Sequence, residues 1–314
     1  MKSNSDESIE LPQHDSQSED IAATIELLWR NKLKIFLSTS VFGLLSLIGS
    51  MLLPSVYSSS VLLAPANQSS SALSGLLEQY GGLASVAGIS LPGSDDDSQI
   101  NLAIEIMKSR AFHSQFVEKN DMAPLIMAVR EWDPQKKEIK FNENYYNSKE
   151  KKWTRKAKPP YGVVPSDEEI HKELKKRISI TSDKKTGFIR VTFMHESPVF
   201  ASRFLGLLVS EVNQKLRNQA ITESKKSIEF LNEQINLSAF ADLNSLFFGL
   251  IEKQTEKIML ASARPEYVFQ IIDPPYVAKK PVSPNRFIIV VMALLLGFMM
   301  SSIYLILVEG KSRE

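Results

Sequence analysis

The chain has 314 residues, of which 43% are hydrophobic, and its 37 basic and 36 acidic side chains leave a net charge of +1. This balance gives no reason to expect a nucleic-acid partner, because phosphate-binding domains usually carry a clustered basic excess. The absence of cysteine excludes disulfides, thiol catalysis and zinc sites built on cysteine.

The N-terminal part combines a polar tail with a first apolar run. Residues 1–20 are polar and acidic, a composition typical of disorder. Residues 21–29 place apolar side chains at helical spacing and end in Trp29, which favours an amphipathic lead-in to a membrane. Residues 35–53 then form a run of 19 residues without a charge. Because about 20 helical residues cross a hydrocarbon layer ~30 Å thick, this run predicts a transmembrane helix.

The next segments alternate between strands, loops and helices. Residues 56–64 are rich in Val, Tyr, Ser and Leu and predict a strand that Pro65 ends. Residues 66–97 are rich in Ser and Gly, which predicts a loosely packed segment. Asp97 or Ser98 is expected to cap a helix that runs to about residue 119.

The middle of the chain contains two further signals for the start of a helix, with a predicted β-hairpin between them. Residues 166–169, Ser-Asp-Glu-Glu, form a capping-box pattern and predict a helix to residue 177. Residues 178–182 and 188–195 alternate around a turn ending in Gly187, which predicts a β-hairpin. Ser197-Pro198 then starts the longest helical stretch, because Ser is a favoured N-cap and Pro a favoured first residue.

That helical stretch, residues 198–263, would be ~100 Å long if unbroken. We expect a reversal near residues 236–239, where Asn and Ser interrupt the apolar spacing. Residues 267–272 predict a final strand, and residues 273–284 form a proline-rich connector. Residues 287–308 are a second apolar run, of 22 residues, and predict a second transmembrane helix.

Basic residues beside the first run indicate its orientation. Arg30, Lys32 and Lys34 stand at its start, and the next basic residue is Lys108. The positive-inside rule therefore places the N-terminus in the cytoplasm, and two spans return the C-terminus there. A signal peptide is the alternative for the first run, but its apolar core would be shorter than this one.

No motif for catalysis, metal or cofactor binding occurs. The four histidines, His14, His113, His171 and His195, do not stand at metal-ligand spacing, although folding could still assemble a composite zinc site. The aspartates at 95–97 lack the spacing of a calcium loop. Neither a phosphate loop nor a nucleophile elbow is present. We therefore predict no catalytic residue, no metal and no cofactor.

Three groups of residues are candidates for contacts. Residues 130–160 mix aromatic side chains, which stack on sugar rings, with lysines that meet acidic groups; the alternative is a surface excursion anchored by a few aromatics. Small residues four apart in the two spans would let helices approach closely. Apolar residues in the helical stretch exceed what one hairpin can bury, which favours association with neighbouring protomers. The candidates are, for glycan, Trp132, Tyr145, Tyr146 and Trp153; for transmembrane packing, Ser46, Ser50, Gly297 and Ser301; and for partner contacts, Leu231, Ile235, Phe247, Phe248, Leu250 and Ile251.

Four segments carry a resemblance to a known family. They are IELLWRNKLKIFL (25–37) leading through the first span to PSVYSSSVLLAP (54–65), GGLASVAGISL (81–91), EWDPQKKEIKFNENYYNSKEKKW (131–153) and EYVFQIIDPPYVAKKPVSPNR (266–286). Together they resemble the Wzz-type polysaccharide co-polymerases, the O-antigen chain-length determinants. Two departures stand out: Ala278 replaces a proline often found there, and the second span has the single glycine Gly297 rather than a cluster.

The resemblance implies an α+β fold in which two transmembrane helices flank a periplasmic α/β base domain carrying a long helical hairpin. The expected parts are a cytoplasmic tail (1–32), a first span (33–53), a periplasmic domain (54–286), a second span (287–308) and a cytoplasmic tail (309–314). Within the periplasmic domain the base would comprise residues 54–197 and 264–286, and the hairpin residues 198–263.

The resemblance also implies a function in the bacterial inner membrane. The protein would be a non-enzymatic regulator that sets the modal chain length of lipid-linked O-antigen. Its partners would be further copies of itself in a ring, a Wzy-type polymerase, undecaprenyl-pyrophosphate-linked polysaccharide and membrane lipid.

Several other functions compete with this one. A two-span sensor or scaffold needs a cytoplasmic output module, for which the two tails are too short. A modulator of a polysaccharide tyrosine kinase needs a separate kinase, because the phosphate loop is missing here. Other export systems, for enterobacterial-common-antigen-like polymers or capsule, are further alternatives. An enzyme of glycan assembly would need paired carboxylates at a credible spacing, and none is evident.

Overall fold

The computed structural model of the chain describes residues 28–66, 93–237 and 241–310. The predicted disordered tail, the motif at residues 81–91 and most of the Ser- and Gly-rich segment therefore lie outside the described residues. Helices and strands are mixed, which confirms the α+β class. The chain divides into two units: residues 1–54 with 283–314, and residues 55–282.

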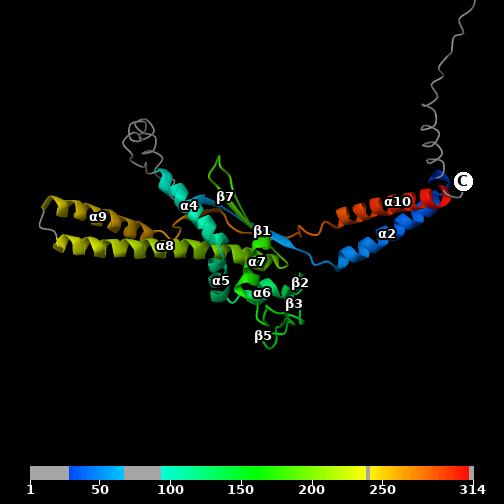
Figure 1. Cartoon of the computed structure of the whole chain (residues 1–314), viewed down its shortest axis with the longest axis horizontal. Helices are drawn as coiled ribbons and strands as arrows, with labels where there is room; N and C mark the ends of the chain where they lie inside the picture. Colours follow the sequence, from blue (N-terminus) through cyan, green and yellow to red (C-terminus); the bar gives the residue numbers. More distant parts are fainter. Residues whose placement is uncertain (1–27, 67–92, 238–240, 311–314) are drawn as a thin grey trace, which may run out of the picture. The chain divides into compact units, whose positions relative to one another are not determined.

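The first unit contains two long apolar helices, α2 (Lys32–Leu52) and α10 (Arg286–Gly310), which pack side by side (Figure 1). Their mean hydropathies of 1.9 and 2.5 make both candidate membrane spans. Only 17% and 11% of the two apolar stretches is buried within the chain. A core helix of a soluble protein would be covered on most sides, so this exposure favours helices that face lipid.

A four-stranded antiparallel sheet of order β6-β7-β1-β8 lies at the centre of the second unit. The central pair is β1 (Tyr57–Pro65) and β7 (Ile189–His195), with β6 (Ile178–Ser182) beside β7 and β8 (Phe269–Asp273) beside β1. The predicted strand at 56–64, hairpin at 178–195 and strand at 267–272 therefore all form. The sheet joins strands from both ends of the unit, so the segments between them must loop out and return.

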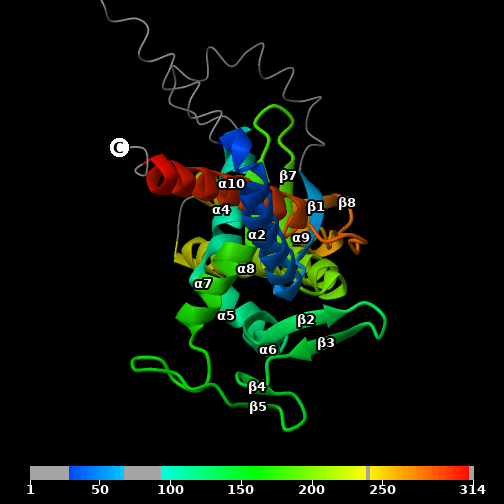
Figure 2. The same ribbon diagram turned by 90° about the vertical axis from the view of Figure 1, so that its right-hand side faces the viewer.

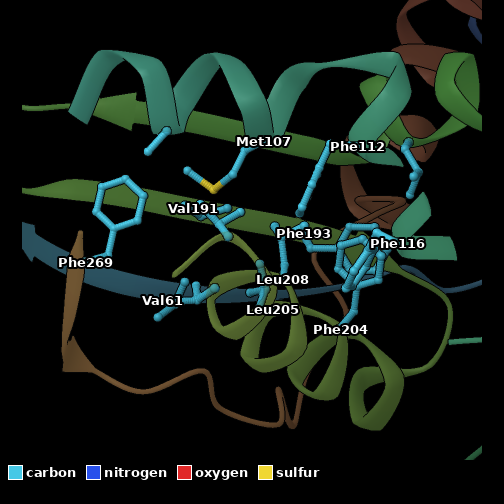
Figure 3. Close-up of a cluster of buried hydrophobic side chains, with 14 of the residues drawn as sticks. Val61, Met107, Phe112, Phe116, Val191, Phe193, Phe204, Leu205, Leu208 and Phe269 are labelled. Carbon is cyan, nitrogen blue, oxygen red and sulfur yellow. The ribbon is translucent and has the colours of Figure 1, made fainter. Parts of the chain in front are cut away.

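One face of this sheet is buried. Val61 on β1 and Val191 and Phe193 on β7 are fully buried, while the alternate residues on both strands, except Ala64 near the end of β1, are partly or fully exposed. Helix α8 (Pro198–Leu237) contacts both strands, and its Phe204 stacks on Phe193 with the ring centroids 3.9 Å apart (Figure 3). Each fully buried side chain of this size stabilises the fold by ~1.5–3 kcal/mol, so this layer anchors α8 to the sheet.

Two helices complete the core where the sequence predicts one. Helix α4 (Gly93–Lys108) begins before the expected cap at Asp97 or Ser98, so that prediction is wrong. A new helix, α5 (Arg110–Lys119), starts after Ser109, whose side chain accepts a hydrogen bond from the Phe112 amide. The break turns the chain so that Met107 of α4 and Phe116 of α5 are both buried in the core (Figure 3).

A small excursion follows α5. It comprises the short helix α6 (Ala123–Met127) and two hairpins, β2 (Val129–Asp133) with β3 (Glu138–Phe141) and β4 (Tyr146–Asn147) with β5 (Lys152–Trp153) (Figure 2). No pattern in the sequence predicts these five elements. The strands are only two to five residues long, too short to leave a hydrophobic period in the sequence.

Helix α7 (Asp167–Arg177) returns the chain to the sheet and shows the predicted capping box. The Ser166 side chain accepts a hydrogen bond from the Glu169 amide, and the Glu169 carboxylate accepts one from the Ser166 amide at 2.9 Å. Three acidic residues in its first turn and three basic residues in its last complement the helix dipole. This local arrangement explains why the boundary is correctly predicted from the sequence.

A helical hairpin projects from the sheet. Helix α8 has 40 residues and begins after Ser197, whose hydroxyl accepts a hydrogen bond from the Phe200 amide. Its second half runs beside α9 (Ala241–Ala263) (Figure 1). The reversal predicted near 236–239 falls between these helices, with residues 238–240 outside the described part.

Candidate functional site

The inner seam of the hairpin holds four of the six predicted partner-contact residues. On α9, Phe247 and Ile251 are half-buried at the spacing that faces α8. On α8, Leu231 is buried and Ile235 half-buried. Because these side chains pack between the two helices of one chain, their first role is to hold the hairpin together.

The outer flanks of α9 carry the apolar surface. Leu243, Leu246 and Leu250 are all exposed and lie on one side of the seam. Phe248 and Met259 are exposed on the other side. Of the six predicted partner-contact residues, only Phe248 and Leu250 are therefore exposed to another molecule. That they contact a second protomer stays a prediction.

Small residues lie where the two apolar helices meet. A Cβ placed on Gly297 would stand 2.9 Å from the Cβ of Phe42, and one on Gly43 would stand 2.8 Å from Leu294. Ser50 is buried, and Ser46 and Ser301 are partly buried. Gly43 is absent from the sequence-based set, because it stands three residues before Ser46 and seven before Ser50 and the set is built on a spacing of four.

The four aromatics predicted to contact glycan do not form one platform. Tyr146 packs edge-to-face against Trp153, with ring centroids 5.1 Å apart, and also contacts Phe141. Trp132 lies half-buried on β2, in the other hairpin. Only Tyr145, 46% exposed, faces a cavity. Tyr146 and Trp153 thus stabilise the excursion, and Tyr145 is the member of the set left free to meet a ligand.

That cavity is an open cleft of about 560 Å³ between residues 143–145, residues 154–158, Tyr161 and Glu169. We call it the tyrosine cleft. Its exposed lining includes Tyr145, Tyr161, Lys156 and Lys158. Tyrosine rings and lysine amines are groups that bind sugars with acidic substituents, so the cleft has the chemistry predicted for this stretch.

Arg155 holds the cleft in shape. Its guanidinium donates two hydrogen bonds to the Glu169 carboxylate, at 2.6 and 2.8 Å, and others to the carbonyls of Val163 and Gly162 at 2.9 and 2.7 Å. The hydrogen bonds from Arg155 lower the pKa of Glu169 to about 2. The Arg155 guanidinium is therefore already engaged by Glu169 and the neighbouring carbonyls. Lys156 and Lys158 are the cations of the cleft that can bind a ligand.

Folding brings together two histidines that are far apart in the sequence. The Nδ1 atoms of His113 and His171 are 2.9 Å apart, and Nε2 of His113 lies 2.7 Å from the Met107 carbonyl oxygen. Burial lowers the pKa of His113 to about 4, so its ring is neutral near pH 7. Among the described residues no group of three or more potential metal ligands occurs.

A third histidine, His195, serves the fold. Its Nε2–H donates to the Leu125 carbonyl at 2.7 Å, and its Nδ1 accepts from the Ser197 amide at 2.9 Å. Burial lowers the pKa of His195 to about 4. The neighbouring Glu196 accepts two hydrogen bonds from Arg177, which stabilise its charged form. Both ring nitrogens of His195 therefore have hydrogen-bond partners within the chain, and the residue fixes the start of α8.

These observations define a class: a membrane protein with two apolar helices and an α+β unit that carries a helical hairpin. Comparison with known proteins specifies the class further. The family model described as Wzz, chain length determinant protein, matches residues 20–120. The resemblance to the Wzz-type polysaccharide co-polymerases is thereby confirmed. A second model, described as "G-rich domain on putative tyrosine kinase", matches residues 242–309.

Two solved structures are similar to the chain at low identity. A "full-length bacterial polysaccharide co-polymerase" shares 13% identity, with 92% of this chain and 97% of that chain covered and a TM-score of 0.39. A fragment of WzzB, a polysaccharide co-polymerase from Salmonella Typhimurium, also shares 13% identity, covering 73% and 100% with a TM-score of 0.29. The comparison with curated proteins yields no match.

Proposed function

We propose that the protein is a non-enzymatic regulator of the modal chain length of lipid-linked O-antigen, working in the bacterial inner membrane with a Wzy-type polymerase. The hairpin unit lies in the periplasm and both termini in the cytoplasm. The single observation that carries the proposal is the match of residues 20–120 to the chain-length determinant family. That segment includes α2 and β1, the first apolar helix and the central strand of the sheet.

The protein acts as a closed assembly of several copies. A ring of identical subunits needs two different surfaces on each subunit, one for each neighbour. The two outer flanks of α9 supply apolar side chains on separate sides of the hairpin, Leu243, Leu246 and Leu250 on one and Phe248 on the other. Such surfaces gain ~25 cal/mol for each Å² of apolar area that association removes from water.

The tyrosine cleft is the proposed contact with the glycan. Tyr145 and Tyr161 offer exposed rings, and Lys156 and Lys158 offer cations for acidic substituents. An open, polar cleft fits a contact that a growing polymer makes and leaves repeatedly, since a tight enclosed site would hold the chain in place. The undecaprenyl-pyrophosphate carrier of that polymer would remain in the membrane.

The test is the distribution of surface polysaccharide on a gel, from cells with and without this gene. We expect a modal band cluster with the gene and a random, mostly shorter distribution without it. Restoring the gene on a plasmid should restore the mode. An unchanged distribution in cells that make O-antigen would refute the proposal.

A second candidate function is favoured by the match of residues 242–309 to the kinase-associated domain. In this version the protein is the membrane partner of a separate tyrosine kinase in a capsule or exopolysaccharide system. Deletion of the gene would then abolish or reduce export of that polymer and leave the O-antigen mode unchanged. The same gel, run beside a capsule assay, separates the two functions.

A further inference from the structure

A second cavity, of about 500 Å³, opens where α4, α5, α7 and β6 meet. We call it the histidine cavity. Its polar lining comprises Glu105 and Lys108 from α4, His113 from α5, His171 and Lys175 from α7, and Ser179 from β6. The tyrosine cleft shares none of these residues.

The proton positions in the histidine pair follow from its hydrogen bonds. The Met107 carbonyl can only accept, so Nε2 of His113 carries the proton. Since His113 is neutral, its Nδ1 has a lone pair and accepts from Nδ1–H of His171. Its Nε2 is therefore the ring nitrogen that the pair leaves available to a ligand.

The charges around the cavity favour an anion. Lys108 and Lys175 are both exposed and line the same space as His171. The opposing charge is Glu105, which pairs with Lys108 at 2.9 Å and is 70% exposed at the rim. His171 and Lys175 stand four residues apart on α7 and thus on one side of that helix. Two lysines outweigh one solvated carboxylate.

We propose that the histidine cavity binds a compact oxyanion of the phosphate or carboxylate class through Lys108 and Lys175, with His171 in the same lining. His113 acts as a positioning residue that fixes the His171 ring through the Nδ1 pair. The volume leaves room beyond one phosphate group, so the anion is a diphosphate or the charged part of a sugar. This inference does not depend on chain-length control.

The experiment is isothermal titration calorimetry of the full-length protein in neutral-lipid nanodiscs. The probes are pyrophosphate, inorganic phosphate and glucuronate, which separate a phosphate ligand from a sugar acid. Lys175→Gln should weaken binding of the preferred probe about tenfold, the loss expected for one charge-assisted hydrogen bond. Glu105→Gln should tighten it, because the change frees Lys108 and removes a negative charge. Both side chains are exposed, so neither variant disturbs the core.

Lys185→Gln, on the exposed turn between β6 and β7, is the matched control and should leave binding unchanged. Three results would overturn the proposal. One is the absence of binding by all three probes. Another is an equal loss in Lys175→Gln and Lys185→Gln, which would indicate non-specific charge attraction. The third is binding of Zn²⁺ that Glu105→Gln weakens, because a metal ion gains from the carboxylate that an anion avoids.

Discussion

Two buried histidines make the stability of the folded unit depend on pH. His113 and His195 each have a pKa lowered from 6.5 to about 4, chiefly because burial disfavours the charged ring. The unfolded chain therefore takes up protons at a higher pH than the folded one. Their stabilising contribution is complete above pH ~6.5 and is lost progressively as the pH falls toward 4.

We expect the free energy of unfolding to fall between pH 7 and pH 5 by about 1–2 kcal/mol for each histidine. The carboxylates of Glu169 and Glu196 have lowered pKa values and lose their contribution only at lower pH, so they do not obscure this window. Denaturant unfolding in detergent at the two pH values measures the change. The double variant His113→Gln with His195→Gln should have a lower free energy of unfolding at pH 7, and that free energy should change less with pH than in the unchanged protein. An equally steep pH dependence would contradict its assignment to these two histidines.

Asn213 is a single buried residue that ties α8 to β8. Its side-chain NH₂ donates to the Phe269 carbonyl at 2.8 Å, and its oxygen accepts from the amides of Val268 and Phe269 at 3.0 and 2.9 Å. Asn213→Ala should cost about 2–4 kcal/mol, because buried backbone groups lose their partners. Asn218→Ala, exposed on the same helix, is the control. Equal unfolding midpoints for the two variants would show that β8 pairs without this tie.

At the scale of elements, α2 and α10 depend on small residues where they meet. A side chain on Gly297 would meet the Cβ of Phe42 at 2.9 Å, and a Cβ cannot swing aside. We therefore expect Gly297→Leu to separate the helices and to lower thermal stability in detergent by about 1–3 kcal/mol. Gly49→Leu is the control, because nothing lies within 4 Å of its added Cβ. Equal effects of the two changes would mean that close helix contact is unimportant.

The structure of the hairpin shows which α9 residues can be changed to test assembly without disrupting the hairpin itself. Phe247 faces the inner seam, so a charge there would damage the hairpin itself. Leu246→Asp with Leu250→Asp instead places charges on one outer flank, and we expect a weaker oligomer with a broader or shorter polysaccharide distribution. Detergent-phase light scattering beside a polysaccharide gel measures both.

Ser245→Asp is the matched control for that prediction. Ser245 is exposed on α9 away from the seam, so the charge is added without removing apolar surface. If the leucine variant keeps an intact oligomer and a normal modal chain length, the flank is not an interface between protomers. An intact oligomer with an altered mode would assign the flank to the polymerase or the glycan.

At the scale of the whole molecule, the two apolar helices predict that the 55–282 unit lies on one side of the membrane. A reporter active only in the periplasm should be active when fused after residue 120 or 220 and silent when fused after residue 314. The basic residues before α2 provide the physical reason, because positively charged flanks stay in the cytoplasm. Activity of the C-terminal fusion would contradict the two-span topology.

The sequence by itself determined the elements whose causes are local. The spans follow from runs of apolar residues, α7 from the Ser166 capping box, and α8 from Ser197-Pro198. The β6–β7 hairpin follows from alternation around Gly187, whose positive φ of 70° a glycine adopts without strain. In each case the residues that cause the element are neighbours in the chain, so their pattern can be read directly.

Only the tertiary structure decided which side chains are available for contact. Tyr146 and Trp153 look like ligand-binding aromatics in the sequence, yet they pack against each other. Leu231 looks like surface, yet α9 covers it. His113 and His171 are 58 residues apart and become partners, because α5 and α7 pack together. Exposure and proximity depend on contacts between distant segments, which no local pattern encodes.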